Sequence, residues 1–503
     1  MSKTAVGYEA LAAGLVLPSN ALIDGKLVRA KSGRTFETVN PATETTIAVV
    51  TSCDAADVDH AVVAARKAFE SGIWSRAGIA KRKDVLLKLA GLVRKHAEQI
   101  AVLESLDTGK PITDCLNEIG NEVPKFFQWY AELLDKSFGK IAPTENDVLA
   151  LIVEEPIGVV GLVLPWNFPL LITAWKVAPA LASGCSVVLK PAEQSPLTSI
   201  RLAELALEAG LPDGVFNVIP GTGEIAGKAL GLHGDVDAVS FTGSSEVGAL
   251  FLRYASDSNL KRVALEMGGK SPMIILSDAD ITDDLINHAA LAAYWNAGQN
   301  CSANMRQLVD ISRKDEFIEK LLVKIRSLKI GNPLDPSTEV GPMITEIHRD
   351  RVQNFIKIGR DEGATTIQSA DVPSKGFYVP PVLFTNVTPD MTIAREEIFG
   401  PVLGVIATSS PEEALRIARD TKYGLHASIF TKDFAKGYAL ARRIPCGTVS
   451  INSFSEGDVT TPFGGYKLSG SAARDKGLEA MQQYQQTKTI WSAVDLPRVI
   501  SSI

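Results

Sequence analysis

The chain has 503 residues, of which 46% are hydrophobic and 22% charged, and its formal net charge is -7 at pH 7. This length exceeds what one ordinary core accommodates and predicts two or three globular domains, while the acidic balance argues against a nucleic-acid partner. The five cysteines lie far apart, without the CxxC or HExxH spacing of metal sites. We therefore expect a reducing, cytoplasmic setting, no disulfide framework and no metal.

Two segments bear on targeting. The first twenty residues lack the basic start and the long apolar run of a signal peptide. Residues 156–175, PIGVVGLVLPWNFPLLITAW, have the length of a membrane span and no charge, but three prolines and an asparagine disfavour a spanning helix. A buried strand, a tight turn and a helix start fit better, so we expect no membrane partner.

The pattern of apolar residues along the chain changes near residue 157. Before it, residues 57–70 and 81–107 have helical apolar spacing with charged outer faces. After it, amphipathic segments such as 199–210 and 224–232 separate short apolar runs that are rich in β-branched residues. These runs are GVVGLVL, CSVVLK, VFNVIPG and AVSFTG. Such strand–helix–strand repetition predicts a parallel sheet covered by helices.

A second series of strands and helices follows Gly268 and Gly269. Its predicted strands are PMIILS, QLVDIS, PVLFTNV, PVLGVIA and ASIFT, and its predicted helices cover 281–299, 314–328, 411–420 and 433–443. The chain thus reads as two consecutive α/β domains. Residues 143–155 and the late segment QTKTIWSAV resemble strands that belong to neither sheet.

Two glycine-rich turns are candidates for holding a phosphate. VIPGTGEIAG (218–227) has the spacing GxGxxxG rather than GxGxxG, and a plain glycine turn before a helix explains it equally well. FTGSSEVG (241–248) is stronger, because a strand ends at Thr242 and Gly243 and a helix then begins. Its free N–H groups and positive helix end suit a pyrophosphate, although Ser244 as an ordinary N-cap is the alternative.

Charged residues follow two other predicted strands. Lys190 and Glu193 lie beyond the end of VVLK, where ligands bind in open α/β sheets and where the pair can bind ribose hydroxyls. A surface ion pair is the alternative. Glu266 ends a strand before two glycines, which suits a general base; a solvated strand-end charge is the alternative.

Cys301 lies in YWNAGQNCSANMR (294–306), among amides and small residues. None of the six histidines lies in a motif-like setting, so a cysteine hydrolase lacks its expected partner. A lone cysteine on a helix is most often inert core filler. From this stretch alone, a nucleophile and a buried filler both remain open.

Seven motifs together carry a resemblance that none carries alone. They are PWNFP (165–169), LKPAE (189–193), FTGSSEVG, LEMGGKSP (265–272), GQNCSA (298–303), EEIFGPV (396–402) and PFGGYKLSG (462–470). In this order and at these separations the chain resembles the aldehyde dehydrogenase superfamily over essentially its whole length. The resemblance implies an NAD-dependent enzyme that oxidises an aldehyde to its carboxylic acid.

The resemblance implies roles for four catalytic residues. Cys301 is the nucleophile, and the reaction passes through a thiohemiacetal and a thioester on its sulfur. Asn167 and the backbone N–H of Cys301 form the oxyanion hole, where one donor typically contributes about 3 kcal/mol. Glu266 is the general base for hydrolysis and is expected to help deprotonate the thiol. Lys176 assists proton movement.

The resemblance also implies residues that bind the cofactor, NAD. Glu397 binds the nicotinamide ribose and Phe399 lies against the nicotinamide, whereas Lys190 and Glu193 hold the adenosine ribose. Glu193 favours NAD over NADP, because a carboxylate repels a 2′-phosphate. The remaining cofactor residues are Val163, Leu164, Pro165, Trp166, Gly223, Phe241, Thr242, Gly243, Ser244, Val247 and Gly268.

The family fold accounts for the two strands without a sheet. It implies two doubly wound parallel-sheet domains and a small β extension that builds a homo-oligomer, commonly a dimer of dimers. We expect the NAD-binding domain at 1–137 and 157–267, the catalytic domain at 268–470, and the oligomerisation strands at 138–156 and 484–503.

The walls of the substrate tunnel are expected to set the choice of aldehyde. They comprise Ile172, Trp175, Tyr294, Trp295 and the segment SFSEGDVTTPF (453–463), which contains Glu456 and Asp458. Gly457 opens the mouth, and the carboxylates of Glu456 and Asp458 offer a negative rim for cationic substrates. The pattern EGD…PFGGYK resembles the bacterial aminoaldehyde branch, which includes γ-glutamyl-γ-aminobutyraldehyde dehydrogenases of putrescine breakdown.

Three alternatives stay open. A broad-range aliphatic or aromatic aldehyde dehydrogenase is suggested by Trp175, Tyr294 and Trp295. A cysteine hydrolase that uses Glu266, and an inactive structural protein on the same fold, are alternatives of other classes.

Overall fold

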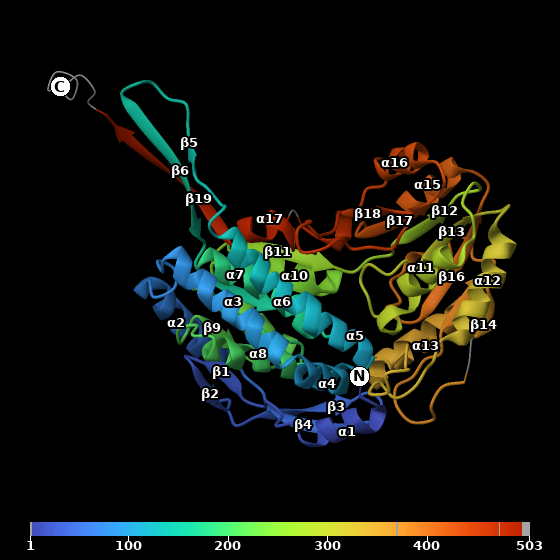
Figure 1. Ribbon diagram of the computed structural model, residues 1–503, viewed down its shortest axis with the longest axis horizontal. Helices are drawn as coiled ribbons and strands as arrows, with labels where there is room; N and C mark the ends of the chain where they lie inside the picture. The colour runs from blue at the N-terminus through green and yellow to red at the C-terminus, as the bar shows by residue number, and fades with distance from the viewer. Residues whose placement is uncertain (1–2, 369–370, 472, 495–503) are drawn as a thin grey trace.

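The structure is a computed structural model that describes residues 3–368, 371–471 and 473–494. Two seven-stranded sheets form its body (Figure 1). The first sheet is parallel except for its edge strands β1 and β2. Its strands in spatial order are β11 (Arg262–Met267), β10 (Ala238–Gly243), β7 (Val159–Val163), β8 (Ser186–Lys190), β9 (Phe216–Val218), β1 (Ala21–Ile23) and β2 (Lys26–Val28).

The second sheet is parallel except for its edge strand β14. In spatial order it contains β14 (Thr365–Gln368), β15 (Val382–Thr385), β16 (Val402–Thr408), β13 (Arg306–Asp310), β12 (Pro272–Ile275), β17 (His426–Phe430) and β18 (Thr448–Ile451). Parallel neighbours require crossover connections, which the helices supply. The prediction of two consecutive doubly wound sheets is confirmed.

Helices of the first part of the chain surround the first sheet (Figure 1). They are α1 (Ala5–Ala13), α2 (Ala55–Ser71), α3 (Ile79–Lys95), α4 (Ala97–Thr108), α5 (Ile112–Asn117), α6 (Val123–Leu133), α7 (Pro169–Ser183), α8 (Leu197–Glu208), α9 (Lys228–Leu232) and α10 (Ser245–Ser256). The helical spacing over 81–107 belongs to two helices, because the chain breaks at His96 between α3 and α4.

The second part of the chain adds seven helices within the described residues. They are α11 (Asp283–Tyr294), α12 (Lys314–Ser327), α13 (Glu346–Asp361), α14 (Thr392–Arg395), α15 (Pro411–Arg419), α16 (Phe434–Ala441) and α17 (Gly477–Gln482). The helix predicted over 281–299 is too long. It ends at Tyr294, because Asn296 and Ala297 take left-handed φ angles of 50° and 54°.

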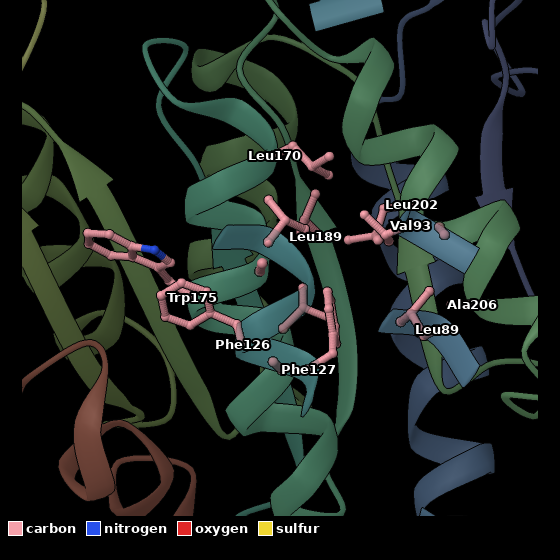
Figure 2. Packing of buried hydrophobic residues seen from close by; sticks show 14 of the residues in the cluster. Leu89, Val93, Phe126, Phe127, Leu170, Trp175, Leu189, Leu202 and Ala206 are labelled. Carbon is pink, nitrogen blue, oxygen red and sulfur yellow. The ribbon is translucent and has the colours of Figure 1, made fainter. Parts of the chain in front are cut away.

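Helix α7 lies at the centre of the largest hydrophobic core. Pro169 at its first turn has a φ that suits a helix start, and Gly184 ends it in a left-handed conformation. All fifteen of its residues are buried. Figure 2 shows Leu170 and Trp175 of α7 among side chains of α3, α6 and α8. The segment 156–175 is therefore a strand, a turn and a buried helix start, as predicted.

Three strands form an arm that leaves the body (Figure 1). They are β19 (Gln485–Ala493), β6 (Val148–Pro156) and β5 (Lys140–Ile141), paired antiparallel in this order. The predicted strands without a sheet thus pair with each other; residues 495–503 of the predicted C-terminal strand segment lie outside the described residues. A separate pair contains β3 (Thr35–Asn40) and β4 (Thr45–Thr51). Within the described part of the chain, every helix is too short or too polar to cross a bilayer.

Candidate active site

One cavity of about 500 Å³ lies where the carboxyl ends of both sheets meet. Its walls come from the connection between β7 and α7, the turn between β10 and α10, the end of β11, and loops of the second sheet. Fifteen residues predicted for the site line it: Pro165, Trp166, Asn167, Ile172, Trp175, Thr242, Gly243, Ser244, Glu266, Gly268, Trp295, Cys301, Glu397, Phe399 and Glu456.

Cys301 reaches this cavity from a turn rather than from a helix. The left-handed residues Asn296 and Ala297 redirect the chain after α11, and Gly298 follows with a φ of 71°. A Cβ on Gly298 would lie 2.3 Å from the carbonyl oxygen of Gly400, so only glycine fits. Burial, and then the charges of nearby carboxylates, raise the pKa of the Cys301 thiol well above its usual value. The thiol is therefore protonated at neutral pH and needs a base to become a nucleophile.

Asn167 lies over the same turn, in the connection that precedes α7. Its Nδ2 donates to the backbone carbonyl oxygen of Gln299 at 3.0 Å, and its backbone carbonyl oxygen accepts from Asn296 Nδ2 at 3.0 Å. These bonds fix the amide beside the cysteine turn. Because an amide nitrogen carries two N–H groups, the second is available to a ligand in the cavity.

Glu266 ends β11 at the cavity wall with 5% of its surface exposed. Among the described residues neither carboxylate oxygen has a hydrogen-bond partner. Burial, and next the charge of Asp475, raise its pKa well above the usual value, while Lys176 opposes this shift. A Cβ on Gly464 would lie 2.5 Å from Oε1, so a glycine leaves room for the carboxylate. An unbonded, basic carboxylate in a cavity has the properties of a proton acceptor.

Lys176 does not line the cavity. Its Nζ donates to Ser240 Oγ at 2.8 Å and to Asp475 Oδ2 at 2.7 Å, and the side chain is fully buried. Asp475 does line the cavity. Lys176 therefore reaches the cavity only through Asp475, a residue that no sequence motif indicated.

The turn between β10 and α10 supports both interpretations of its serine. Ser244 is the N-cap of α10, and its Oγ accepts from the N–H of Val247 at 3.3 Å. Ser244 also lines the cavity, together with Thr242, whose hydroxyl is buried without a partner among the described residues. An unused hydroxyl and the positive end of a twelve-residue helix fit the pyrophosphate of a dinucleotide.

Glu397 and Gly268 lie against each other in the cavity wall. Oε1 of Glu397 accepts from the N–H of Gly269 at 2.9 Å, and a Cβ on Gly268 would lie 2.0 Å from Oε2. Burial raises the pKa of Glu397 to about 7. An acceptor held in this way fits the hydroxyls of a ribose.

An aromatic cluster stands beside Glu397. The rings of Trp166 and Phe399 lie edge to face at 5.3 Å, and His348 contacts both at 5.2 and 6.0 Å. Phe399 has a left-handed φ of 60°, and its carbonyl oxygen lies 2.7 Å from His348 Nε2. Burial lowers the pKa of His348 to about 4, so the ring is neutral. His348 is a cavity residue that sequence reasoning missed, because no motif surrounds it.

Lys190 and Glu193 lie beyond β8, outside the cavity lining. Nζ of Lys190 donates to the carbonyl oxygen of Pro191 at 2.6 Å and to Glu193 Oε2 at 3.2 Å. The lysine is buried, whereas the glutamate side chain is 35% exposed. The two side chains thus form the ion pair that was the alternative interpretation. The carboxylate of Glu193 is partly exposed, so a hydroxyl donor can reach it.

Five further residues that were predicted to bind the cofactor do not line the cavity. Gly223 begins a short helical turn, and nothing lies within 4 Å of a Cβ placed on it. Val247 is half exposed in the first turn of α10. Val163, Leu164 and Phe241 are buried in or beside the first sheet and do not line the cavity.

Aromatic rings form the other side of the cavity. Trp175, Trp295 and Ile172 line it, as does Phe463 from the predicted segment 453–463. Phe168, which sequence reasoning missed, lines it too. Tyr294 does not: it is buried in the core of the second sheet, and its hydroxyl donates to the carbonyl oxygen of Val382 at 3.2 Å.

The two carboxylates of the predicted rim differ. Glu456 turns inward and lines the cavity, where it accepts from Asn300 Nδ2 at 3.1 Å and from Ser302 Oγ, on either side of Cys301. Asp458 is exposed outside the lining and accepts from the N–H and the hydroxyl of Thr460 at 2.9 and 2.6 Å. Of the two carboxylates of the predicted rim, only that of Glu456 therefore lies in the cavity.

Comparisons with known proteins agree with this geometry. The family model "Aldehyde dehydrogenase family" matches residues 27–490. The curated aminoacetaldehyde dehydrogenase of Pseudomonas aeruginosa is 47% identical over 484 residues, which are 96% of this chain and 97% of that protein.

Solved structures share the fold. The γ-glutamyl-γ-aminobutyraldehyde dehydrogenase of Burkholderia cenocepacia superposes with a TM-score of 0.95 at 46% identity, covering 98% of this chain and all of that one. The indole-3-acetaldehyde dehydrogenase AldA of P. syringae, solved with NAD+ and IAA, gives 0.96 at 44% identity with the same coverage. With the family model matching most of its length, the chain belongs to the aldehyde dehydrogenase family.

Proposed function

We propose that the protein oxidises polar aldehydes that carry an amino or acylated amino group, with NAD as the electron acceptor. The observation that carries this proposal is the convergence of Cys301, Asn167, Glu266 and Glu397 on one cavity. The aminoacetaldehyde and γ-glutamyl-γ-aminobutyraldehyde dehydrogenases among its relatives support the substrate class.

The chain's own residues divide the reaction between them. The Cys301 thiol gives its proton to Glu266, the sulfur bonds to the aldehyde carbon, the carbonyl π bond breaks, and the oxygen gains the negative charge. The second N–H of Asn167 Nδ2 and the backbone N–H of Cys301 stabilise this oxyanion. The chemistry that bound NAD supplies is acceptance of the hydride that leaves the aldehyde carbon.

A thioester on Cys301 then has to be hydrolysed. Glu266 accepts a proton from the attacking water, the C–S bond breaks, and the acid and the free cysteine are released. Its unbonded carboxylate and raised pKa suit this task. Asp475, held by Lys176, offers a carboxylate from which the proton can pass onward.

Residues from both parts of the chain would hold the cofactor. At the carboxyl end of the first sheet, the N-terminal turn of α10 would bind the pyrophosphate and the pair Lys190–Glu193 the adenosine ribose. From the second part of the chain, Glu397 would bind the nicotinamide ribose. The exposed carboxylate of Glu193 favours NAD over its 2′-phosphorylated form.

Assembly and compartment are part of the same proposal. The arm of β5, β6 and β19 is offered as the oligomerisation surface of a dimer or a dimer of dimers, because Trp491 and Ile490 on it are 66% and 43% exposed. Five unpaired cysteine thiols favour a cytoplasmic enzyme.

The test is NADH formation with 3-aminopropanal, 3-acetamidopropanal and hexanal. We expect both polar aldehydes to exceed hexanal in kcat/KM. Equal rates with hexanal would favour a broad-range enzyme instead. No NADH from any aldehyde would eliminate a dehydrogenase, and ester hydrolysis without NAD would then identify a cysteine hydrolase.

A further inference from the structure

Lys476 has a backbone conformation that is almost confined to glycine. Its φ is 60° and its ψ is 177°, at the N-cap of α17. Strained residues of this kind persist where the surrounding structure requires them, and they cluster at functional sites. Here the conformation sends two neighbouring side chains to different places: Asp475 lines the cavity beside Glu266, and Lys476 goes to its aromatic wall.

The ammonium of Lys476 is buried without a close counter-ion. The residue is 2% exposed, and Nζ donates to the carbonyl oxygen of Glu456 at 2.7 Å. Nζ also lies 4.9 Å from the ring centre of Trp175 and 5.2 Å from that of Phe463. No carboxylate of the described residues is within 4 Å of it. One carbonyl dipole and two ring faces are therefore its direct contacts. Four carboxylates act on it from farther away, those of Glu456, Asp458, Asp475 and Glu122.

The two rings separate this charge from the cavity. Trp175 and Phe463 line the cavity, lie 5.4 Å apart, and cross at 66°, whereas Lys476 is not part of the lining. A second cation held against the cavity side of the same rings would be about 10 Å from Nζ. At that distance two like charges still repel in a partly buried site. The rings are already polarised by one cation and attract a second one less.

We propose that Lys476 is a specificity-determining residue, which makes the Trp175–Phe463 wall unfavourable for a free ammonium and favourable for a neutral polar tail such as an acylated amine. The inference rests on the proposed aldehyde oxidation and adds the charge state of the substrate to it. Away from this wall, the inward carboxylate of Glu456 beside Cys301 can still attract an ammonium.

The test compares two aldehydes that differ only in charge, 3-acetamidopropanal and 3-aminopropanal. For each enzyme variant the ratio of their kcat/KM values is measured. We expect Lys476→Met to shift this ratio about five- to tenfold toward 3-aminopropanal, since the variant keeps an unbranched side chain against the rings but removes the charge. Lys476→Arg should keep the wild-type ratio.

Two further variants separate charge from structure. Lys476→Gln removes the charge but retains a donor for the Glu456 carbonyl, and it should shift the ratio as the methionine variant does. Lys357→Met removes an exposed charge on α13 and should leave the ratio unchanged. A ratio that stays constant in the methionine and glutamine variants, or that moves away from 3-aminopropanal, overturns the inference. A wild-type enzyme that forms no NADH from either aldehyde defeats the proposed function instead.

Discussion

The two sides of the cavity are built in different ways. The cofactor side consists of turns at strand ends, where a few consecutive residues such as Thr242, Gly243 and Ser244 create a binding surface from backbone and helix dipole. The substrate side consists of side chains from distant segments, such as Trp175 and Phe463. The difference teaches that a cofactor site can be read from local sequence, whereas substrate choice depends on tertiary contacts. The predictions below challenge or sharpen that contrast.

The largest effect is expected where the two sides meet. Cys301→Ala removes the nucleophile and should lower kcat/KM by at least about 10⁴-fold. Binding of NAD, followed by quenching of tryptophan fluorescence, should be unchanged, because the backbone and helix dipole that hold it are intact. An equal loss of NAD affinity would show that the two sides are not independent.

Glu266→Gln should separate the two chemical steps. Without a base for water, we expect the steady-state kcat to fall about 10²- to 10⁴-fold. A burst of NADH in the first turnover should keep its amplitude but form more slowly, because the hydride leaves before hydrolysis whereas the thiol also loses its base. Stopped-flow absorbance measures both quantities. Loss of the burst amplitude together with kcat would show that deprotonation of the thiol, and not hydrolysis alone, requires Glu266.

The cofactor side should respond to pH through Glu397. Its pKa of about 7 lies above the usual value, so the carboxyl is neutral below that pH and loses its acceptor character. Affinity for NAD should therefore increase as the pH rises, by about tenfold between about pH 6 and about pH 8. Calorimetric titration of the wild type and of Glu397→Gln checks this; the variant should show a flat profile. A pH-independent wild type would contradict the assignment.

The smallest effect is expected at the outer rim. Asp458 is exposed and already bonded to Thr460 in its own loop, so Asp458→Asn should change KM for 3-aminopropanal by less than about twofold. Glu456→Gln is the matched comparison, because its carboxylate lines the cavity, and it should raise KM more. A larger effect of the Asp458 variant would show that Asp458 also attracts the cationic substrate, as the sequence suggested.

The sequence predicted the fold well because strand and helix periodicities are local. The strand, turn and helix over 156–175 and the strand-to-helix turn at Ser244 are found as expected. The end of α11 was not foreseen, because alanine rarely takes a left-handed φ, although asparagine such as Asn296 does so more often. The turn is held by a tertiary contact, since Asn296 donates to the carbonyl oxygen of Asn167.

The site was predicted unevenly for the same reason. Residues within motifs, such as Cys301 and Glu397, reach the cavity, whereas Tyr294 and Asp458 do not. Neighbouring positions in sequence point in different directions, and spacing alone does not settle which one faces inward. His348, Asp475 and Lys476 were missed because their positions depend on contacts with segments far away in the chain.

Gly268 and Glu397 have a consequence for how the sequence can vary over time. Gly268 follows β11 of the first sheet and Glu397 precedes β16 of the second, yet a methyl group added to Gly268 would collide with the carboxylate of Glu397. The carboxylate would then have to move from the N–H of Gly269 that it accepts from. Variation at position 268 is therefore limited by position 397, whereas a smaller residue at 397 meets no such limit.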